Sequence, residues 1–170
     1  MQQSTVKSKI DIVQFSKVHQ ESVEKLVLPI QQIEFAVPIT REEQPDLTDI
    51  QGTFFCGGGG FWVALSCDEV VGTIGIVDIG NSEVALKKMF VRADFRGKEY
   101  GVSAQLMDRV KQHCRENGIE RIYLGTTSQM AAAHKFYEKN GFIETDRTKL
   151  PSSFPVVHVD TKFYRCELSV

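Results

Sequence analysis

The stretch Met89–Leu106, "MFVRADFRGKEYGVSAQL", begins as an apolar run, passes through a polar loop and opens into an amphipathic helix. The loop holds four residues that suit an anion: Arg96, Gly97, Lys98 and Gly101. Glycine lets a ligand approach the backbone, and a helix N-terminus offers unpaired N–H groups with a partial positive charge. We therefore expect a phosphate or pyrophosphate site over residues 96–103.

Two common nucleotide-binding patterns do not fit this loop. The pattern GxxxxGK[ST] fails because Arg92 stands at its first glycine and Glu99 follows Lys98. The dinucleotide pattern GxGxxG is absent. If only the loop is considered, an alternative remains open: the segment is a solvent-exposed loop with a glycine hinge that binds no anion.

The chain before this stretch predicts a strand, helices and then strands. Lys9–Phe15 alternates as a strand does, and a following helix carries an apolar stripe that Pro29 should kink or break. A second helix is expected within residues 41–55. Residues 61–80 predict a hairpin with its turn at Cys67–Glu69, and Glu83–Val91 predicts a third strand in this group.

After the loop, the pattern alternates between helix and strand. Apolar residues recur four apart on one predicted helix, at Val102, Leu106, Val110 and Cys114, and Gly118 suits its end. A strand over residues 119–127 and an alanine-rich helix over 129–142 follow, and His158 begins a β-prone tail. This order predicts an α/β fold with a mixed sheet in a single domain, residues 1–170.

The composition excludes several classes of protein. The 170 residues carry a net charge of −2, which argues against a nucleic-acid partner, and no apolar run is long enough to span a membrane. The N-terminus lacks the apolar core of a signal peptide. The four cysteines form no CxxC pair, so we expect no metal, mostly buried reduced thiols and a cytoplasmic location.

Two segments together resemble the motifs of the GNAT N-acetyltransferase superfamily. "FVRADFRGKEYGVSAQLM" is similar to its acetyl-CoA binding motif, and "AAAHKFYEKNGF" is similar to its later helix, in the family's order and with a predicted strand between them. The resemblance implies a GNAT-like acyl-CoA N-acyltransferase fold, in which two neighbouring parallel strands splay apart between flanking helices. It also implies direct acetyl transfer from acetyl-CoA to a primary amine in a ternary complex.

The resemblance assigns site residues by position. The splayed strands would be residues 83–91 and 121–126, with backbone groups of Met89 and Val91 pairing with pantetheine and the Met89 N–H polarising the thioester. Tyr137 matches the family's acid; the alternative is a core aromatic beside Phe136. The implied cofactor-binding residues are Met89, Phe90, Val91, Arg96, Gly97, Lys98, Tyr100, Gly101, Val102 and Ser103.

The general base is less clearly marked. The family often uses a glutamate on the strand that here carries Lys87 and Lys88. Glu34 is our first candidate, with Asp78, Glu83 or a water chain as alternatives. Two further departures affect cofactor contacts, since Glu99 replaces a usual glycine and Met130 replaces a frequent asparagine.

The resemblance leaves the acceptor open. The acids Glu34, Glu42, Glu43 and Asp46 would suit a cationic amine, and Asp160 could line the pocket. A polyamine, an amino acid, an aminoglycoside-like drug and a protein amine all remain possible acceptors. The alternative function is a non-catalytic acyl-CoA-binding or sensing module on the same fold. A homodimer is also possible, supported by the β-prone C-terminal strand.

Overall fold

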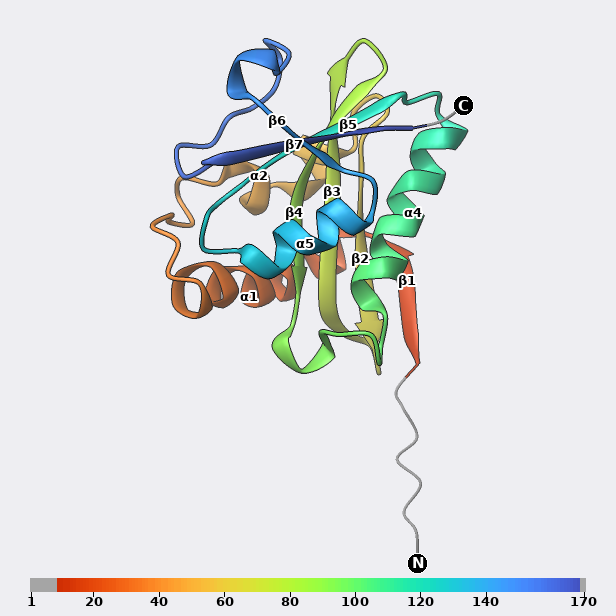
Figure 1. The fold of residues 1–170 in the computed structure, drawn as a ribbon. Helices are drawn as coiled ribbons and strands as arrows, with labels where there is room; N and C mark the ends of the chain where they lie inside the picture. Colours follow the sequence, from red (N-terminus) through yellow and green to blue (C-terminus); the bar gives the residue numbers. More distant parts are fainter. Residues whose placement is uncertain (1–8, 169–170) are drawn as a thin grey trace, which may run out of the picture.

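The structure is a computed structural model that describes residues 9–168. The expectation of no signal peptide rests partly on residues 1–8, and the predicted tail includes residues 169–170; both segments lie outside the described residues. Within the described part, helices flank one open mixed sheet, so the predicted α/β class is confirmed (Figure 1). None of the helices in this part of the chain is long and apolar enough to cross a membrane.

The described residues form a seven-stranded sheet in the order β1-β2-β3-β4-β5-β7-β6. Every neighbouring pair is antiparallel except β4 and β5, which run parallel. The strands are β1 (Ile10–Gln14), β2 (Gly60–Ser66), β3 (Glu69–Gly80), β4 (Glu83–Val91), β5 (Arg121–Thr126), β6 (Ile143–Thr145) and β7 (Lys162–Glu167).

The predicted hairpin forms between β2 and β3. Its two turn residues, Cys67 and Asp68, have φ angles of 49° and 62°. Positive φ at both central positions matches the twist of the flanking strands, as in hairpins with two-residue turns. A second tight turn, at Asn81 and Ser82, joins β3 to β4 with the same sign of φ.

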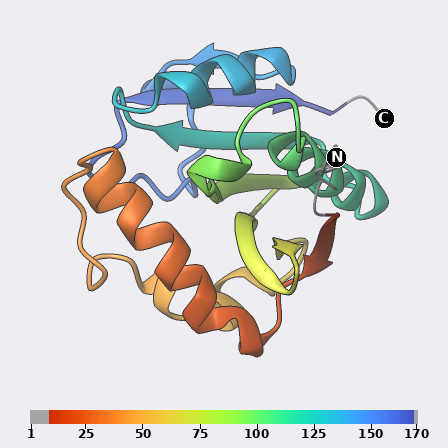
Figure 2. The ribbon, with the colours of Figure 1, turned by 90° about the horizontal axis from the view of Figure 1, so that it is seen from below.

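Helices cover both faces of the sheet (Figure 2). The helices are α1 (Gln20–Pro29), α2 (Pro45–Thr48), α3 (Ile50–Phe54), α4 (Val102–Glu116) and α5 (Ala131–Lys139). Short 3-10 turns lie at Lys17–His19, Ala93–Phe95 and Arg147–Lys149. α1 lies on one face, whereas α4 and α5 lie on the other (Figure 2).

Pro29 changes the first helix as expected. α1 ends at this proline, and a π-helical turn continues over Ile30–Glu34. Proline removes a donor and clashes with the preceding turn, which favours such a change of hydrogen-bonding pattern. The second expected helix appears as two short helices, α2 and α3, separated by Asp49, whose side chain accepts a hydrogen bond from the Gly52 N–H.

The predicted stripe of α4 is fully buried. Leu106, Val110 and Cys114 have no exposed surface, and they pack against the strands in one large apolar cluster. The helix ends at Glu116, and Gly118 follows with a φ of 69°. The apolar repeat therefore fixes which face of α4 meets the sheet.

Two details differ from the sequence-based expectations. Cys56 and Cys67 are exposed, so only Cys114 and Cys166 fit the expectation of mostly buried thiols; all four are free. His158 lies in a turn before β7 and does not begin that strand. β6 pairs outside β7, over Phe163–Arg165, so β7 is not the edge strand of the sheet. The homodimer stays a prediction.

Candidate acetyl-CoA site

The two parallel strands separate partway along their length. β4 and β5 pair through three positions, of which Ala85↔Tyr123 is the last, although β4 continues to Val91 and β5 to Thr126. Beyond that position the described strands show no pairing with each other. A gap therefore opens between β4 and β5 at the end of β4 that leads into the loop (Figure 1).

A β-bulge in β4 helps to shape this gap. The register between β3 and β4 shifts between Thr73 and Gly75, and Lys88 takes a φ of 55°. The Thr73 hydroxyl donates to the Lys88 carbonyl at 2.7 Å. An extra residue in one strand bends that strand and redirects its side chains, which is common near functional sites.

The alternation after the bulge determines which backbone groups face the gap. The Arg92 N–H donates to the Val71 carbonyl, and Phe90 pairs with Thr73, so both point toward β3. Met89 and Val91 therefore direct their backbone groups the other way, toward β5. The Val91 carbonyl accepts a hydrogen bond from Arg96 Nε at 2.8 Å, which leaves the Met89 backbone and the Val91 N–H at the gap.

The loop after β4 brings the start of α4 to the lower end of the gap (Figure 1). Gly97 and Gly101 have φ angles of 99° and 61°, and Gly101 is the N-cap of α4. An added Cβ would meet no atom within 4 Å at Gly97 and only Gln105 Nε2, at 3.9 Å, at Gly101. This open backbone and the unpaired first-turn N–H groups of α4 form a cradle for an anion.

The remaining residues of the loop differ in how far they are buried. Lys98 and Glu99 are exposed, whereas Val102 is buried in the core. The Tyr100 ring is half-buried and packs on Phe95, with ring centroids 4.8 Å apart.

The Arg96 side chain does not extend from the loop into solvent. Besides the Val91 carbonyl, its guanidinium contacts both carboxylate oxygens of Glu34 and lies over the Phe35 ring. The hydrogen bonds from Arg96 hold the pKa of Glu34 below its usual range. The loop is therefore tied to the π-helical turn, and Glu34 is a weak proton acceptor while this ion pair persists.

Tyr137 lies on α5 and is almost completely buried. Its ring packs among three others, with centroid distances of 6.0 Å to Phe136, 5.6 Å to Phe142 and 6.0 Å to Tyr164. Burial, with a smaller effect of Tyr164, raises the pKa of Tyr137 well above its usual range. Its phenol therefore stays protonated at neutral pH, as a proton donor must. No hydrogen bond to its hydroxyl is found within residues 9–168.

Two of the alternative bases lie at the wrong end of the sheet. Glu83 begins β4 and pairs with Arg121 at 2.6 Å, and the length of β4 places it roughly 20 Å from Met89. Asp78 accepts hydrogen bonds from Gly58 and Gly80 beside the β3–β4 turn. Neither carboxylate can reach a group bound at Met89.

A buried polar network covers β4 on the α1 and α2 side. Asp46 Oδ2 lies 2.8 Å from Lys87 Nζ and 3.2 Å from Lys88 Nζ. Lys88 also donates to Gln44 Oε1 at 2.8 Å, and Gln44 and Gln31 exchange hydrogen bonds at 2.9 Å. Adjacent strand residues normally face opposite ways, so the bulge at Lys88 accounts for both lysines reaching one carboxylate.

The charges in this network affect one another strongly. Burial alone would raise the pKa of Asp46, but Lys88 and Lys87 together lower it. Burial lowers the pKa of Lys88, against the attraction of Asp46. The sequence analysis missed this network, although two adjacent lysines inside an otherwise apolar strand were its visible signal.

Asp160 lies across the gap, over β5. A Cβ added at Gly125 would come within 2.6 Å of Asp160 Oδ2, so only glycine leaves room for this carboxylate. Asp160 also accepts a hydrogen bond from the Val157 N–H at 3.1 Å. Burial raises the pKa of Asp160, while Lys87 and Lys88 act in the opposite direction. Lys87 and Gly125 each lie two positions beyond the last paired residues, Ala85 and Tyr123, so Asp160 lies over the strand that faces the lysines across the gap.

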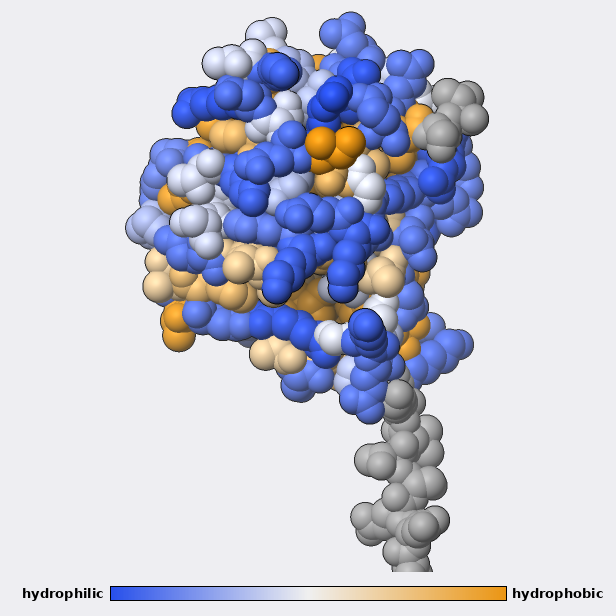
Figure 3. Space-filling model, in the orientation of Figure 1, coloured by the Kyte–Doolittle hydropathy of each residue, from blue (hydrophilic) through white to orange (hydrophobic). Residues whose placement is uncertain are grey.

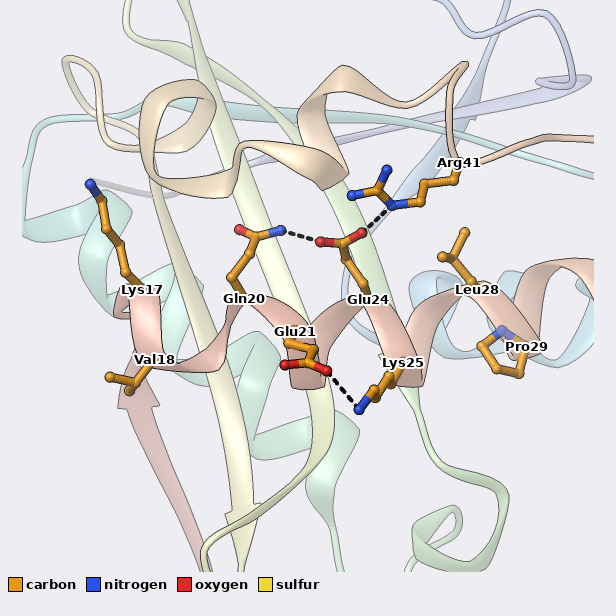
Figure 4. A pocket seen from close by; sticks show the side chains of 9 residues that line it. All are labelled: Lys17, Val18, Gln20, Glu21, Glu24, Lys25, Leu28, Pro29 and Arg41. Atoms are coloured by element: carbon orange, nitrogen blue, oxygen red, sulfur yellow. Dashed lines mark hydrogen bonds and ion pairs between the residues drawn. The ribbon is translucent and has the colours of Figure 1, made fainter.

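The molecular surface has two hollows, one near the strand gap and one along α1. A recess with an apolar floor lies between α5 and the loop after β4 (Figure 3). The other hollow, about 670 Å³, lies along the outward face of α1. Glu24 there pairs with Arg41 at 2.5 Å, and Glu21 pairs with Lys25 (Figure 4). This second hollow lies away from the strand gap and lacks its backbone groups.

The strand gap, the anion cradle and the buried tyrosine are the features that the sequence analysis expects of an acetyl-CoA site. The family model "Acetyltransferase (GNAT) family" matches residues 26–142, and the chain belongs to this family.

Relatives of this chain include two N-acetylaspartate synthetases. The protein from Danio rerio is 35% identical over 106 residues, which cover 61% of this chain and 37% of the relative. The protein from Xenopus tropicalis is 38% identical over 101 residues, covering 57% and 36%. The chain thus spans little more than a third of the length of these relatives.

Solved structures resemble the whole described fold. An acetyltransferase of the GNAT family from Staphylococcus aureus Mu50 has a TM-score of 0.91 at 40% identity, covering 94% of this chain and 99% of the neighbour. An acetyltransferase from Streptococcus agalactiae 2603 has a TM-score of 0.88 at 28% identity, covering 94% and 98%.

Proposed function

We propose that this chain transfers an acetyl group from acetyl-CoA to an amine. The observation that carries this proposal is the gap between β4 and β5, which has the N-terminus of α4 at one end. A strand-like pantetheine arm would pair with the Met89 and Val91 backbone, and the pyrophosphate would meet the amides of residues 97–103.

The residues present fit such a cosubstrate. Gly97 and Gly101 keep the loop backbone open to an anion. The hydroxyl of Thr127, just after β5, is buried and has no hydrogen-bond partner within the described residues. A polar ligand in the gap would satisfy it, since buried hydroxyl groups are normally hydrogen-bonded. The guanidinium group of Arg96 can bind the phosphate only if it first releases the carboxylate of Glu34.

The chain's groups would act at two points of the reaction. The Met89 N–H would stabilise the charge that develops on the thioester oxygen. As the new C–N bond forms and the C–S bond breaks, Tyr137 would give its proton to the leaving sulfur and recover one from the attacking nitrogen. Its raised pKa ensures that the proton is present when it is needed.

The first proton must leave the ammonium group before attack. Glu34 as its acceptor stays a prediction, because the ion pair with Arg96 would have to open first. The raised pKa of Asp160 makes it the stronger proton acceptor of the two carboxylates in this structure. The pH profiles of kcat for Asp160→Asn and Glu34→Gln distinguish the two carboxylates. The wild-type kcat should fall at low pH as the base is protonated, and the variant that lacks this fall identifies the base.

Fold neighbours bind the expected cosubstrate. A PaiA N-acetyltransferase from Thermoplasma acidophilum, with a TM-score of 0.70 at 15% identity, was solved with coenzyme A. An N-acetylglutamate synthase from Neisseria gonorrhoeae, with a TM-score of 0.71 at 12% identity, was solved with coenzyme A and N-acetylglutamate. At these identities the likeness concerns the fold alone, so it supports the proposal only in general terms.

Calorimetric titration with acetyl-CoA tests the proposed site. Gly101→Glu should abolish binding, because it places an anion and a strained side chain at the cradle. Gly118→Glu is the matched control, since Gly118 also has positive φ and open space but lies at the other end of α4. Adenosine diphosphate should compete with acetyl-CoA. Equal loss in both variants, or wild-type binding in Gly101→Glu, would remove the loop from the site.

The alternative function, a non-catalytic acyl-CoA-binding or sensing module, makes a different prediction. Such a module would bind acetyl-CoA with the same sensitivity to Gly101→Glu but would release no thiol with any amine. The protonated Tyr137 favours the enzyme, because mere binding requires no proton donor.

A further inference from the structure

Two of the acids that could attract a cationic acceptor are neutralised by cationic side chains within the protein. Glu34 is held by Arg96, and Asp46 by Lys87 and Lys88. Glu43 accepts from Thr40 and contacts His158 at 2.8 Å. The acceptor side therefore presents fewer free negative charges than its sequence suggests, which disfavours a polyamine.

The two lysines have more hydrogen-bond donors than partners. Each ammonium group carries three N–H donors. Within the described residues their contacts are Asp46, shared by both, and Gln44, which takes one bond from Lys88. The side chains of Lys87 and Lys88 are only 17% and 8% exposed. Partly satisfied ammonium groups in such a site favour an anionic ligand.

The other strand that borders the gap carries the complementary charge. Asp160 lies half-buried over Gly125 of β5 and has no ion pair within residues 9–168. Lys88 precedes Met89, the residue placed at the thioester carbonyl. A ligand that spans from the lysines to Asp160 would therefore lie along β4 next to Met89.

We propose that Lys87, Lys88 and Asp160 form an acceptor site for a free amino acid, in which the lysines bind the carboxylate and Asp160 receives the ammonium group. This inference rests on the proposed acetyl-transfer function and deepens it by naming the substrate class. Opposite charges on the two walls fix the orientation of a zwitterion, so that its nitrogen faces the thioester.

A panel of matched acceptors tests this assignment in the full chain. Each free amino acid is compared with its own amide and with the corresponding amine that lacks the carboxyl group, and spermidine is added as a polycation. Thiol release from acetyl-CoA gives kcat/KM for each acceptor. The free amino acid should exceed its amide by about tenfold to 100-fold, the range for a hydrogen-bonded ionic contact. Equal rates for amide and acid, or a preference for spermidine, would overturn the inference.

Lys87→Gln assigns that preference to the lysine pair. The measured quantity is the ratio of kcat/KM for the free amino acid to that for its amide, which cancels a general loss of folded protein. This ratio should fall at least about tenfold in Lys87→Gln. Lys25→Gln, an exposed lysine on α1, should keep the wild-type ratio. An unchanged ratio in Lys87→Gln would remove Lys87 from the site.

Failure of this inference can be told from failure of the proposed function. Acetyl-CoA binding together with transfer to amides or polyamines would leave the acetyltransferase standing and overturn the amino-acid site. Absence of acetyl-CoA binding by the wild type would overturn both.

Discussion

Replacing Tyr137 by phenylalanine removes one oxygen atom and little else. The ring keeps its contacts with Phe136, Phe142 and Tyr164, so the core packing is preserved. Because the hydroxyl makes no hydrogen bond within the described residues, its loss leaves no broken pair. We expect the free energy of unfolding to change by less than about 1 kcal/mol, because no hydrogen bond is lost.

The effect on the rate should be much larger. Loss of a positioned proton donor costs about 10²- to 10⁴-fold in rate, which corresponds to roughly 3–5 kcal/mol of transition-state stabilisation. The assay is thiol release at saturating acetyl-CoA, together with calorimetric affinity for acetyl-CoA. We expect kcat to fall while the affinity stays near the wild-type value.

Tyr164 provides the matched control. It is also buried, but its hydroxyl donates to Glu138 Oε2 at 2.9 Å. Tyr164→Phe should therefore cost about 1–2 kcal/mol of stability and leave kcat nearly unchanged. A Tyr137→Phe enzyme with kcat within threefold of the wild type, or a Tyr164→Phe enzyme with the larger rate loss, would refute the acid assignment.

Three further predictions concern the carboxylates. Asp46→Asn should cost about 3 kcal/mol at neutral pH, because two buried lysines lose their shared counter-ion. Because the pKa of Asp46 is lowered in the folded protein, its contribution to folding stability is present above the unfolded pKa and is lost as the pH falls. Urea titrations should therefore show the stability difference between the variant and the wild type shrinking below about pH 4. A difference that does not change with pH would contradict the ion pair. Asp160→Asn should instead raise folding stability at neutral pH. The pKa of Asp160 is raised in the folded protein, so the stability that this carboxyl group contributes is lost as the pH rises. A lower melting temperature of the variant would argue against this. Glu34→Gln should weaken the tie between the loop and the π-helical turn, seen as faster amide exchange in residues 96–101, and unchanged exchange would show that the ion pair does not hold the loop.

Much of the fold could be predicted from local patterns. The four-residue apolar repeat of α4 gave its buried face, and Pro29 marked the end of α1. Boundaries between short elements were less clear, because a single capping side chain, Asp49, separates α2 from α3. The place of β7 between β5 and β6 depends on long-range pairing that local periodicity does not encode.

The candidate site was predictable where it depends on backbone and unpredictable where it depends on side chains from distant segments. The glycine pattern of the loop indicated the cradle, because positive φ at Gly97 and Gly101 is a local property. The bond between Arg96 and Glu34 joins residues far apart in sequence. The bulge that directs Lys87 and Lys88 to Asp46 arises from pairing with β3, so neither contact was visible in the sequence.

A crystal structure of the full chain with coenzyme A tests the central claim most directly. The account predicts the pyrophosphate against the amides of residues 97–103 and the pantetheine arm between β4 and β5, with its sulfur near the Tyr137 hydroxyl. Coenzyme A bound elsewhere, such as in the hollow along α1, or β4 and β5 paired along their whole length in that crystal, would contradict it.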